Sequence, residues 1–176
     1  VAARMDADLY VIGLEYLQAT EQNPGAWAEV ARRVRSEFAG PLTYAANWWK
    51  EYEVFGDWSA FDYVGVNAYF PLSSATDPDA GALVSAWGPH LDAMGAVAAR
   101  TNKSILFTEA GLRAVRGAAA RPWDHGLDGA NDPALQARAV EALLAAAHAR
   151  PWFRGVYWWK WFTDAGAAEH DPYDLA

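Results

Sequence analysis

Cysteine is absent from the 176-residue sequence, and this absence excludes several kinds of chemistry at once. Without a thiol, the chain has no disulfide bond, no thiolate metal ligand and no cysteine nucleophile. Long hydrophobic runs are absent as well, and the apolar runs that exist are too short to span a bilayer. We therefore expect no membrane among the partners of this chain.

Basic side chains are also scarce. The sequence has 14 Lys and Arg against 22 Asp and Glu, which gives a formal net charge of −8. Because phosphate backbones attract lysine and arginine, this balance argues against nucleic acid as a partner.

Several catalytic motifs are missing. The sequence has no glycine-rich phosphate loop and no Gly-x-Ser-x-Gly elbow. Its four histidines do not have the spacing of metal ligands: His90, His125, His148 and His170. We therefore expect no metal, no nucleotide and no other cofactor.

The hydrophobic residues that are present are arranged like those of a parallel α/β domain. Five short apolar runs predict strands at 9–13, 42–46, 63–67, 104–108 and 155–159. Most of these runs are apolar on both faces, which suits buried parallel strands. Apolar stripes at helical spacing predict helices between them, over 27–38, 83–98 and 135–146. The first stripe consists of Trp27, Val30, Val34 and Phe38.

This alternation fits two architectures. One is a complete doubly wound sheet, and the other is the C-terminal part of a (β/α)8 barrel, which typically needs about 250 residues. The chain begins with Val1 rather than Met and opens almost directly into a strand-like run. We therefore expect a piece of a longer protein. The stretch 113–131 is expected to be a long loop at the functional edge of the sheet.

Two glutamates stand just past the ends of predicted strands. Glu15 follows the first strand and Glu109 follows the fourth. The carboxyl ends of parallel strands are where such folds bind ligands, and glycoside hydrolysis needs two carboxyl groups with different roles. The alternative is structural, because a strand-end glutamate also caps a loop or pairs with an arginine such as Arg113.

Aromatic side chains gather at the same strand ends. The sequence has 10 Trp, which is unusually many, and several of them are adjacent. Indole rings pack against the flat C–H faces of sugars, although core packing is the alternative role. Side chains alternate along a strand, so Trp158 and Trp159 are expected on opposite faces, and we favour Trp159 for the interior of a barrel.

Five segments together resemble glycoside hydrolase family 113, in the right order and spacing. They are residues 42–48, 62–72, 105–111, 121–124 and 155–159. That family contains β-mannanases with a (β/α)8 barrel, and they belong to a large clan of retaining enzymes. The resemblance implies that residues 1–176 form a single partial catalytic domain, comprising about strands four to eight of the barrel.

The resemblance also implies roles for individual residues. Glu15 matches the acid/base after strand four, and Glu109 matches the nucleophile after strand seven. Five further residues would line the sugar site: Asn47, Trp48, Asn67, Tyr69 and Trp159. The clan often has Asn directly before the acid/base, whereas this sequence has Leu14 there.

The function expected from this resemblance is retaining hydrolysis of β-1,4-mannan or a related β-linked polysaccharide, without a cofactor. The expected partner is therefore an oligo- or polysaccharide. Two alternatives stay open: a non-catalytic carbohydrate-binding fragment, and a complete doubly wound domain with an unrelated small ligand. Localisation, whether extracellular or cytoplasmic, and oligomeric state also stay open.

Overall fold

The computed structural model describes residues 2–163 and 171–175, and five parallel strands form one sheet in this part of the chain. The strands are β1 (Tyr10–Leu14), β2 (Leu42–Asn47), β3 (Val64–Asn67), β4 (Ile105–Ala110) and β5 (Phe153–Trp158). Their order in the sheet is β1-β2-β3-β4-β5, and every neighbouring pair is parallel. The spatial order of the strands therefore follows the chain without a reversal.

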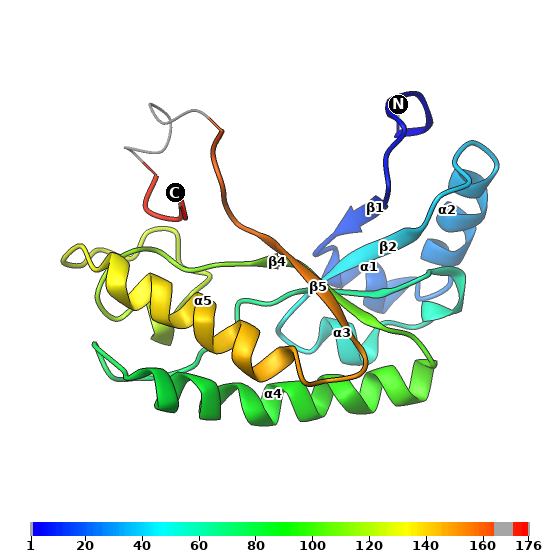
Figure 1. Ribbon diagram of the computed structural model, residues 1–176. Helices are drawn as coiled ribbons and strands as arrows, with labels where there is room; N and C mark the ends of the chain where they lie inside the picture. Colours follow the sequence, from blue (N-terminus) through cyan, green and yellow to red (C-terminus); the bar gives the residue numbers. More distant parts are fainter. Residues whose placement is uncertain (1, 164–170, 176) are drawn as a thin grey trace.

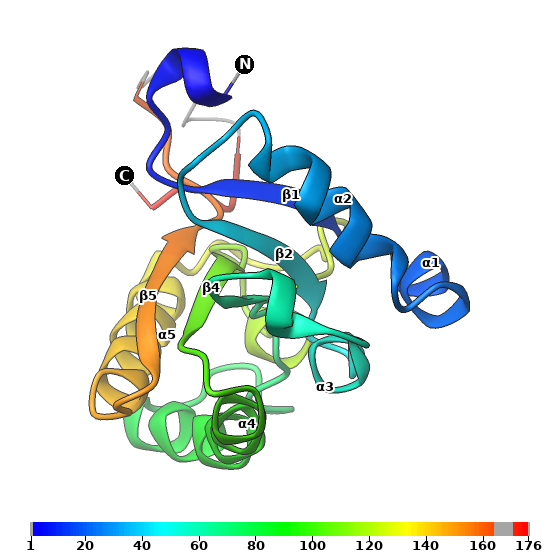
Figure 2. The same ribbon diagram turned by 90° about the vertical axis from the view of Figure 1, so that its right-hand side faces the viewer.

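The helices cover one side of this sheet. They are α1 (Leu17–Gln22), α2 (Ala26–Arg35), α3 (Glu51–Val54), α4 (Ala80–Thr101) and α5 (Pro133–Ala147), with short 3-10 turns η1 (Ala2–Met5), η2 (Trp58–Ala60) and η3 (Ala118–Ala120). Crossovers between parallel strands are right-handed, so a sequential strand order places successive helices on one face. Figure 1 shows α4 and α5 side by side below the sheet, and Figure 2 shows α3, α4 and α5 around its outer side.

This topology decides between the two architectures that the sequence left open. A doubly wound sheet has a point where the strand order reverses and helices switch faces. No such point exists among the five strands of the described residues. The doubly wound alternative is therefore wrong, and the arrangement is that of consecutive βα units of a barrel.

The sequence predicted most elements to within a few residues, but it did not predict α1 or α3, and it placed the end of α2 too late. α1 was not predicted, because its six residues have no apolar stripe and bury only Thr20. α2 ends at Arg35, so Phe38 is buried beyond the helix rather than within it. Val30 is 37% exposed, since α2 packs beside the edge strand β1, and no further strand pairs with β1 in the described part of the chain.

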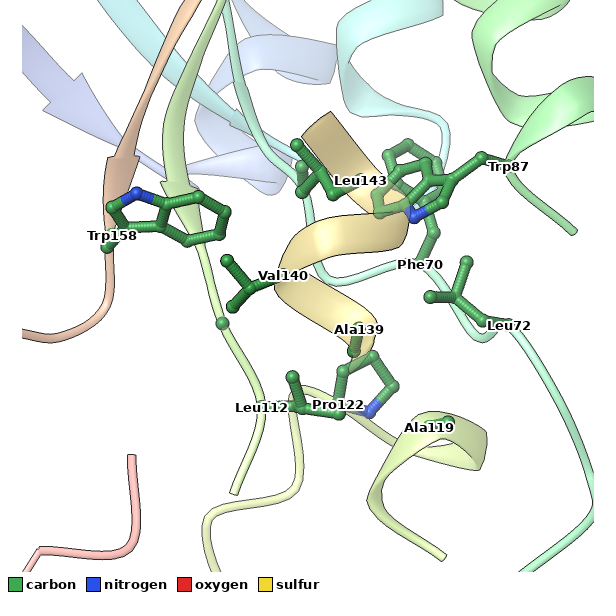
Figure 3. Close-up of a pocket in the computed structure, with 12 residues that line it drawn as sticks. Phe70, Leu72, Trp87, Leu112, Ala119, Pro122, Ala139, Val140, Leu143 and Trp158 are labelled. Carbon is green, nitrogen blue, oxygen red and sulfur yellow. The ribbon is translucent and has the colours of Figure 1, made fainter. Parts of the chain in front are cut away.

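The core between sheet and helices is closely packed. Figure 3 shows an apolar cavity between β5, α4 and α5, lined by side chains that include Trp158, Val140 and Trp87. Its volume is about 20 Å³, which holds no more than a single water molecule. The helix-covered face of the sheet therefore has no space for a ligand at this point.

No helix in the ranges 2–163 and 171–175 combines the length and the apolar character needed to cross a membrane.

Candidate active site

All seven site residues predicted from the sequence line one open cavity at the carboxyl ends of the strands. The cavity has a volume of about 310 Å³. The seven are Glu15, Asn47, Trp48, Asn67, Tyr69, Glu109 and Trp159, and the lining also includes Leu14, Trp123, His125 and Tyr173. The structure thus brings together residues that are up to 144 positions apart in the sequence, from Glu15 to Trp159 (159 − 15).

Glu15 directly follows β1 in a constrained backbone conformation. Its φ angle is 53°, in the left-handed region that costs a non-glycine residue about 1–2 kcal/mol. Hydrogen bonds on both sides hold this conformation. The Glu15 N–H donates to the carbonyl of Ala45 at 2.9 Å, and the following N–H of Tyr16 donates to the Tyr44 hydroxyl at 2.7 Å. The turn at Glu15 is therefore fixed against β2.

Glu109 lies within β4, which continues to Ala110, so the sequence-based expectation that it follows the strand end was wrong by two residues. The hydroxyl of Tyr69 donates a hydrogen bond of 2.8 Å to its Oε2 atom. Burial raises the pKa of Glu109, the Tyr69 hydrogen bond opposes this effect, and the negative charge of Glu15 adds to it. The net result is a raised pKa. Both carboxylates line the same cavity.

Asn67 and Tyr69 come from the end of β3 and contact different carboxylates. The Asn67 side-chain amide donates to Oε1 of Glu15 at 2.8 Å, and its own oxygen accepts from the Thr108 hydroxyl at 2.8 Å. Burial and the nearby Glu109 charge raise the pKa of Tyr69, so its hydroxyl keeps its proton and acts as a donor. Glu15 and Glu109 therefore differ in their immediate surroundings.

Indole rings form the walls of the cavity. Trp48 stacks on Trp123 with 4.8 Å between ring centroids and 27° between ring planes. Trp159 is 44% exposed, and the Lys160 ammonium group lies 5.1 Å from its ring centroid. Trp158 points to the other side of β5, into the apolar cavity of Figure 3, so the two adjacent tryptophans occupy opposite faces.

Besides Leu14, three lining residues were not assigned to the site from the sequence. Trp123 belongs to a segment that resembles family 113, but the resemblance gave it no role. His125 and Tyr173 carry no local signal, because tertiary contacts bring them to the cavity. The Arg113 guanidinium group donates to the carbonyl of His125, and the Tyr173 hydroxyl donates to the carbonyl of Pro122 at 3.0 Å. Arg113 therefore holds this loop, and in the described part of the chain it makes no ion pair with Glu15 or Glu109.

A metal centre is not formed by the part of the chain that the structure describes. No group of three or more His, Asp or Glu side chains there is arranged around a common point. His170, one of the four histidines considered above, lies outside the described residues.

The family model of Glycoside Hydrolase Family 113 matches residues 1–175. The chain belongs to glycoside hydrolase family 113. No curated protein sequence matches it.

This chain has the same fold as solved structures of family 113 mannanases. It aligns to a family 113 β-1,4-mannanase solved as a complex with a TM-score of 0.83 and 25% identity, covering 99% of this chain and 53% of that one. The family 113 β-mannanase of Alicyclobacillus acidocaldarius, solved in complex with ManMIm, gives a TM-score of 0.81 and 30% identity, with coverage of 98% and 51%. The chain thus spans about half the length of these enzymes, which confirms the predicted partial (β/α)8 barrel.

A more distant structure shares only the fold. The β-glucuronidase of Bifidobacterium dentium aligns with a TM-score of 0.67 and 18% identity, covering 96% of this chain and 27% of that one.

Proposed function

We propose that this chain carries the catalytic carboxylates of a retaining glycoside hydrolase that acts on β-1,4-mannan or a related β-linked polysaccharide. The observation that carries the proposal is the meeting of Glu15 and Glu109, from β1 and β4, in one open cavity with different hydrogen-bond partners. Membership of family 113 and the likeness to two family 113 mannanases support the choice of substrate.

In this mechanism Glu109 is the nucleophile. Its carboxylate attacks the anomeric carbon and forms a glycosyl ester, while the bond to the leaving oxygen breaks. Glu15 donates a proton to that oxygen in the first step. It then removes a proton from water, which attacks the ester and releases the sugar with its original configuration. The Tyr69 hydroxyl holds Glu109 in place, and Asn67 does the same for Glu15.

The remaining lining residues bind the sugar. Trp48 and Trp159 offer indole faces to pyranose rings, and Asn47 supplies polar contacts at the cavity edge. Leu14 also lines the cavity, so an apolar side chain occupies the place where the clan often has Asn.

The test is trapping of the glycosyl-enzyme. A fluorinated mannoside with a good leaving group should label the wild-type chain on Glu109, as read by peptide mass spectrometry. Glu109→Ala should abolish both labelling and mannan hydrolysis. Hydrolysis by Glu109→Ala at the wild-type rate would exclude this residue as the nucleophile.

A non-catalytic carbohydrate-binding function is the second candidate. It is favoured by the exposed rings at the cavity, since Trp123 and Trp159 are 42% and 44% exposed. Calorimetry with mannooligosaccharides separates the two functions. Binding without turnover or labelling would support this second function and reject the first.

A further inference from the structure

Glu51 is a fully buried carboxylate with no role in the mechanism above. It lies in α3 with 0% of its surface exposed. A buried charge is costly unless hydrogen bonds replace the lost water. Three donors do so: the Tyr44 hydroxyl at 2.7 Å and the Thr20 hydroxyl at 2.9 Å, both to Oε1, and the Asn47 N–H at 2.7 Å to Oε2.

These donors belong to the two segments that carry site residues. Asn47 itself lines the cavity and is followed by Trp48. On the other side, the Tyr44 hydroxyl accepts the N–H of Tyr16, which is the amide directly after Glu15. The Thr20 hydroxyl also lies 3.0 Å from the carbonyl oxygen of Tyr16. One carboxylate thus connects the turn after β1 with the turn after β2.

We propose that Glu51 is a positioning residue that fixes Glu15 and the Asn47–Trp48 segment relative to each other. This inference rests on the proposed role of Glu15 as acid/base. The turn at Glu15 has a left-handed backbone, so it needs the support that the Tyr16 hydrogen bond supplies. Glu51 orients the Tyr44 hydroxyl for that bond by accepting its proton.

The protonation of Tyr44 fits this arrangement. Burial raises the pKa of Tyr44, and the Glu51 carboxylate adds to the effect, although the Thr20 and Tyr16 contacts oppose it. The hydroxyl therefore keeps its proton. It donates that proton to Glu51 and remains free to accept from the Tyr16 amide.

Substrates that differ in leaving group test the proposal. Phenyl β-mannobioside needs a well-placed acid, whereas the dinitrophenyl derivative leaves without one. In Glu51→Ala the kcat/KM for the phenyl substrate should fall by about 100-fold, the loss expected for a misplacement of about 1 Å. The kcat/KM for the dinitrophenyl substrate should change little, because it reports only the first step, in which this leaving group needs no acid. Glu51→Gln should give a smaller loss than Glu51→Ala, because its amide oxygen still accepts from the Asn47 N–H, whereas its NH₂ group cannot accept the Tyr44 proton.

A matched pair of threonines provides a control if Glu51→Ala does not fold. Thr20 and Thr43 are both buried, at 2% and 0% exposure. Only Thr20 contacts Glu51, whereas the Thr43 hydroxyl donates to the carbonyl of Tyr63. Thr20→Val should reduce the phenyl rate selectively, and Thr43→Val should not. Equal losses on both substrates, or equal effects of the two threonine variants, would overturn the positioning role.

A measurement without turnover separates this inference from the proposed function. Amide hydrogen exchange of Tyr16 and Asn47 should accelerate in Glu51→Ala and Thr20→Val, but not in Thr43→Val. If the wild-type chain hydrolyses neither substrate, the proposed function fails. The exchange data still show whether Glu51 holds the turn after β1 and the turn after β2 together. Unchanged exchange at both amides would show that Glu51 does not hold these segments.

Discussion

The side-chain amide of Asn67 donates a hydrogen bond of 2.8 Å to the Glu15 carboxylate, and this contact joins the end of β3 to the residue after β1. The Thr108 hydroxyl donates to the oxygen of the same amide. A carboxylate only accepts, and the hydroxyl occupies the amide oxygen, so the NH₂ group must face Glu15. Asn67 is 1% exposed, so its amide is largely shielded from bulk water.

Replacing Asn67 should impair proton donation by Glu15. Hydrogen bonds to charged groups contribute about 1.5–3 kcal/mol, so Asn67→Ala should lower kcat for phenyl β-mannobioside by about 10- to 100-fold. Thr108→Val keeps the amide but releases its oxygen, and it should give a smaller loss. Steady-state kinetics measure both variants. Unchanged kcat in Asn67→Ala would contradict the role of this contact.

Tyr69→Phe should shift the pH profile of the reaction. The Tyr69 hydrogen bond lowers the pKa of Glu109, against the burial that raises it. Removing the hydroxyl should raise that pKa further, so the acidic limb of kcat/KM should move to higher pH. Tyr157→Phe, on an exposed ring of β5, is the control and should leave the profile unchanged. An acidic limb that stays in place in Tyr69→Phe would show that this hydrogen bond does not tune Glu109.

Glu109 should also lower the stability of the fold at neutral pH. The pKa of Glu109 is higher in the folded state than in the unfolded state. Its stabilising contribution to the free energy of unfolding is therefore present below the unfolded-state pKa, and it is lost as the pH rises through the folded-state pKa. Glu109→Gln stays neutral and still accepts from Tyr69. It should therefore raise Tm near neutral pH, and the difference should shrink toward about pH 4.

Glu29, an exposed glutamate, should change stability with pH in the opposite direction, and it serves as the control. Hydrogen bonding to Arg32 lowers the pKa of Glu29, so any contribution of this pair is present above the unfolded pKa and is lost as the pH falls. Glu29→Gln should therefore not raise Tm at neutral pH. If thermal melts show no stabilisation by Glu109→Gln, the ionised carboxylate is not a cost to folding.

The sequence predicted the parts of the site that depend on strand pattern. An apolar run followed by a glutamate places Glu15 at the end of β1, and a similar run places Glu109 close to the end of β4. Because the carboxyl ends of parallel strands meet at one edge of the sheet, the strand pattern alone predicts that the two glutamates lie at that edge. Alternation along β5 likewise predicted that Trp158 and Trp159 occupy opposite faces, as the structure has them.

Features that depend on distant partners could not be predicted in this way. Glu51 lies in a short segment that carried no helical pattern, and its burial depends on Thr20, which is 31 residues away. Tyr173 reaches the cavity edge through a contact 51 residues away, with Pro122. Periodicity describes only the neighbours of a residue along its own element, so such pairings become visible only in the folded chain.

Gly111 should be indispensable for the position of Trp159. A Cβ atom at residue 111 would lie 2.0 Å from the carbonyl oxygen of Trp159, and the rigid backbone there cannot yield without moving the indole ring. Gly111→Ala should therefore destabilise the fold by about 1–3 kcal/mol and weaken mannooligosaccharide binding. Gly25→Ala is the matched control, because no atom lies within 4 Å of its added Cβ, and its effect should stay within about 0.5 kcal/mol. Denaturant unfolding and calorimetry measure the two effects, and equal stability of both variants would show that the sheet edge accommodates the methyl group.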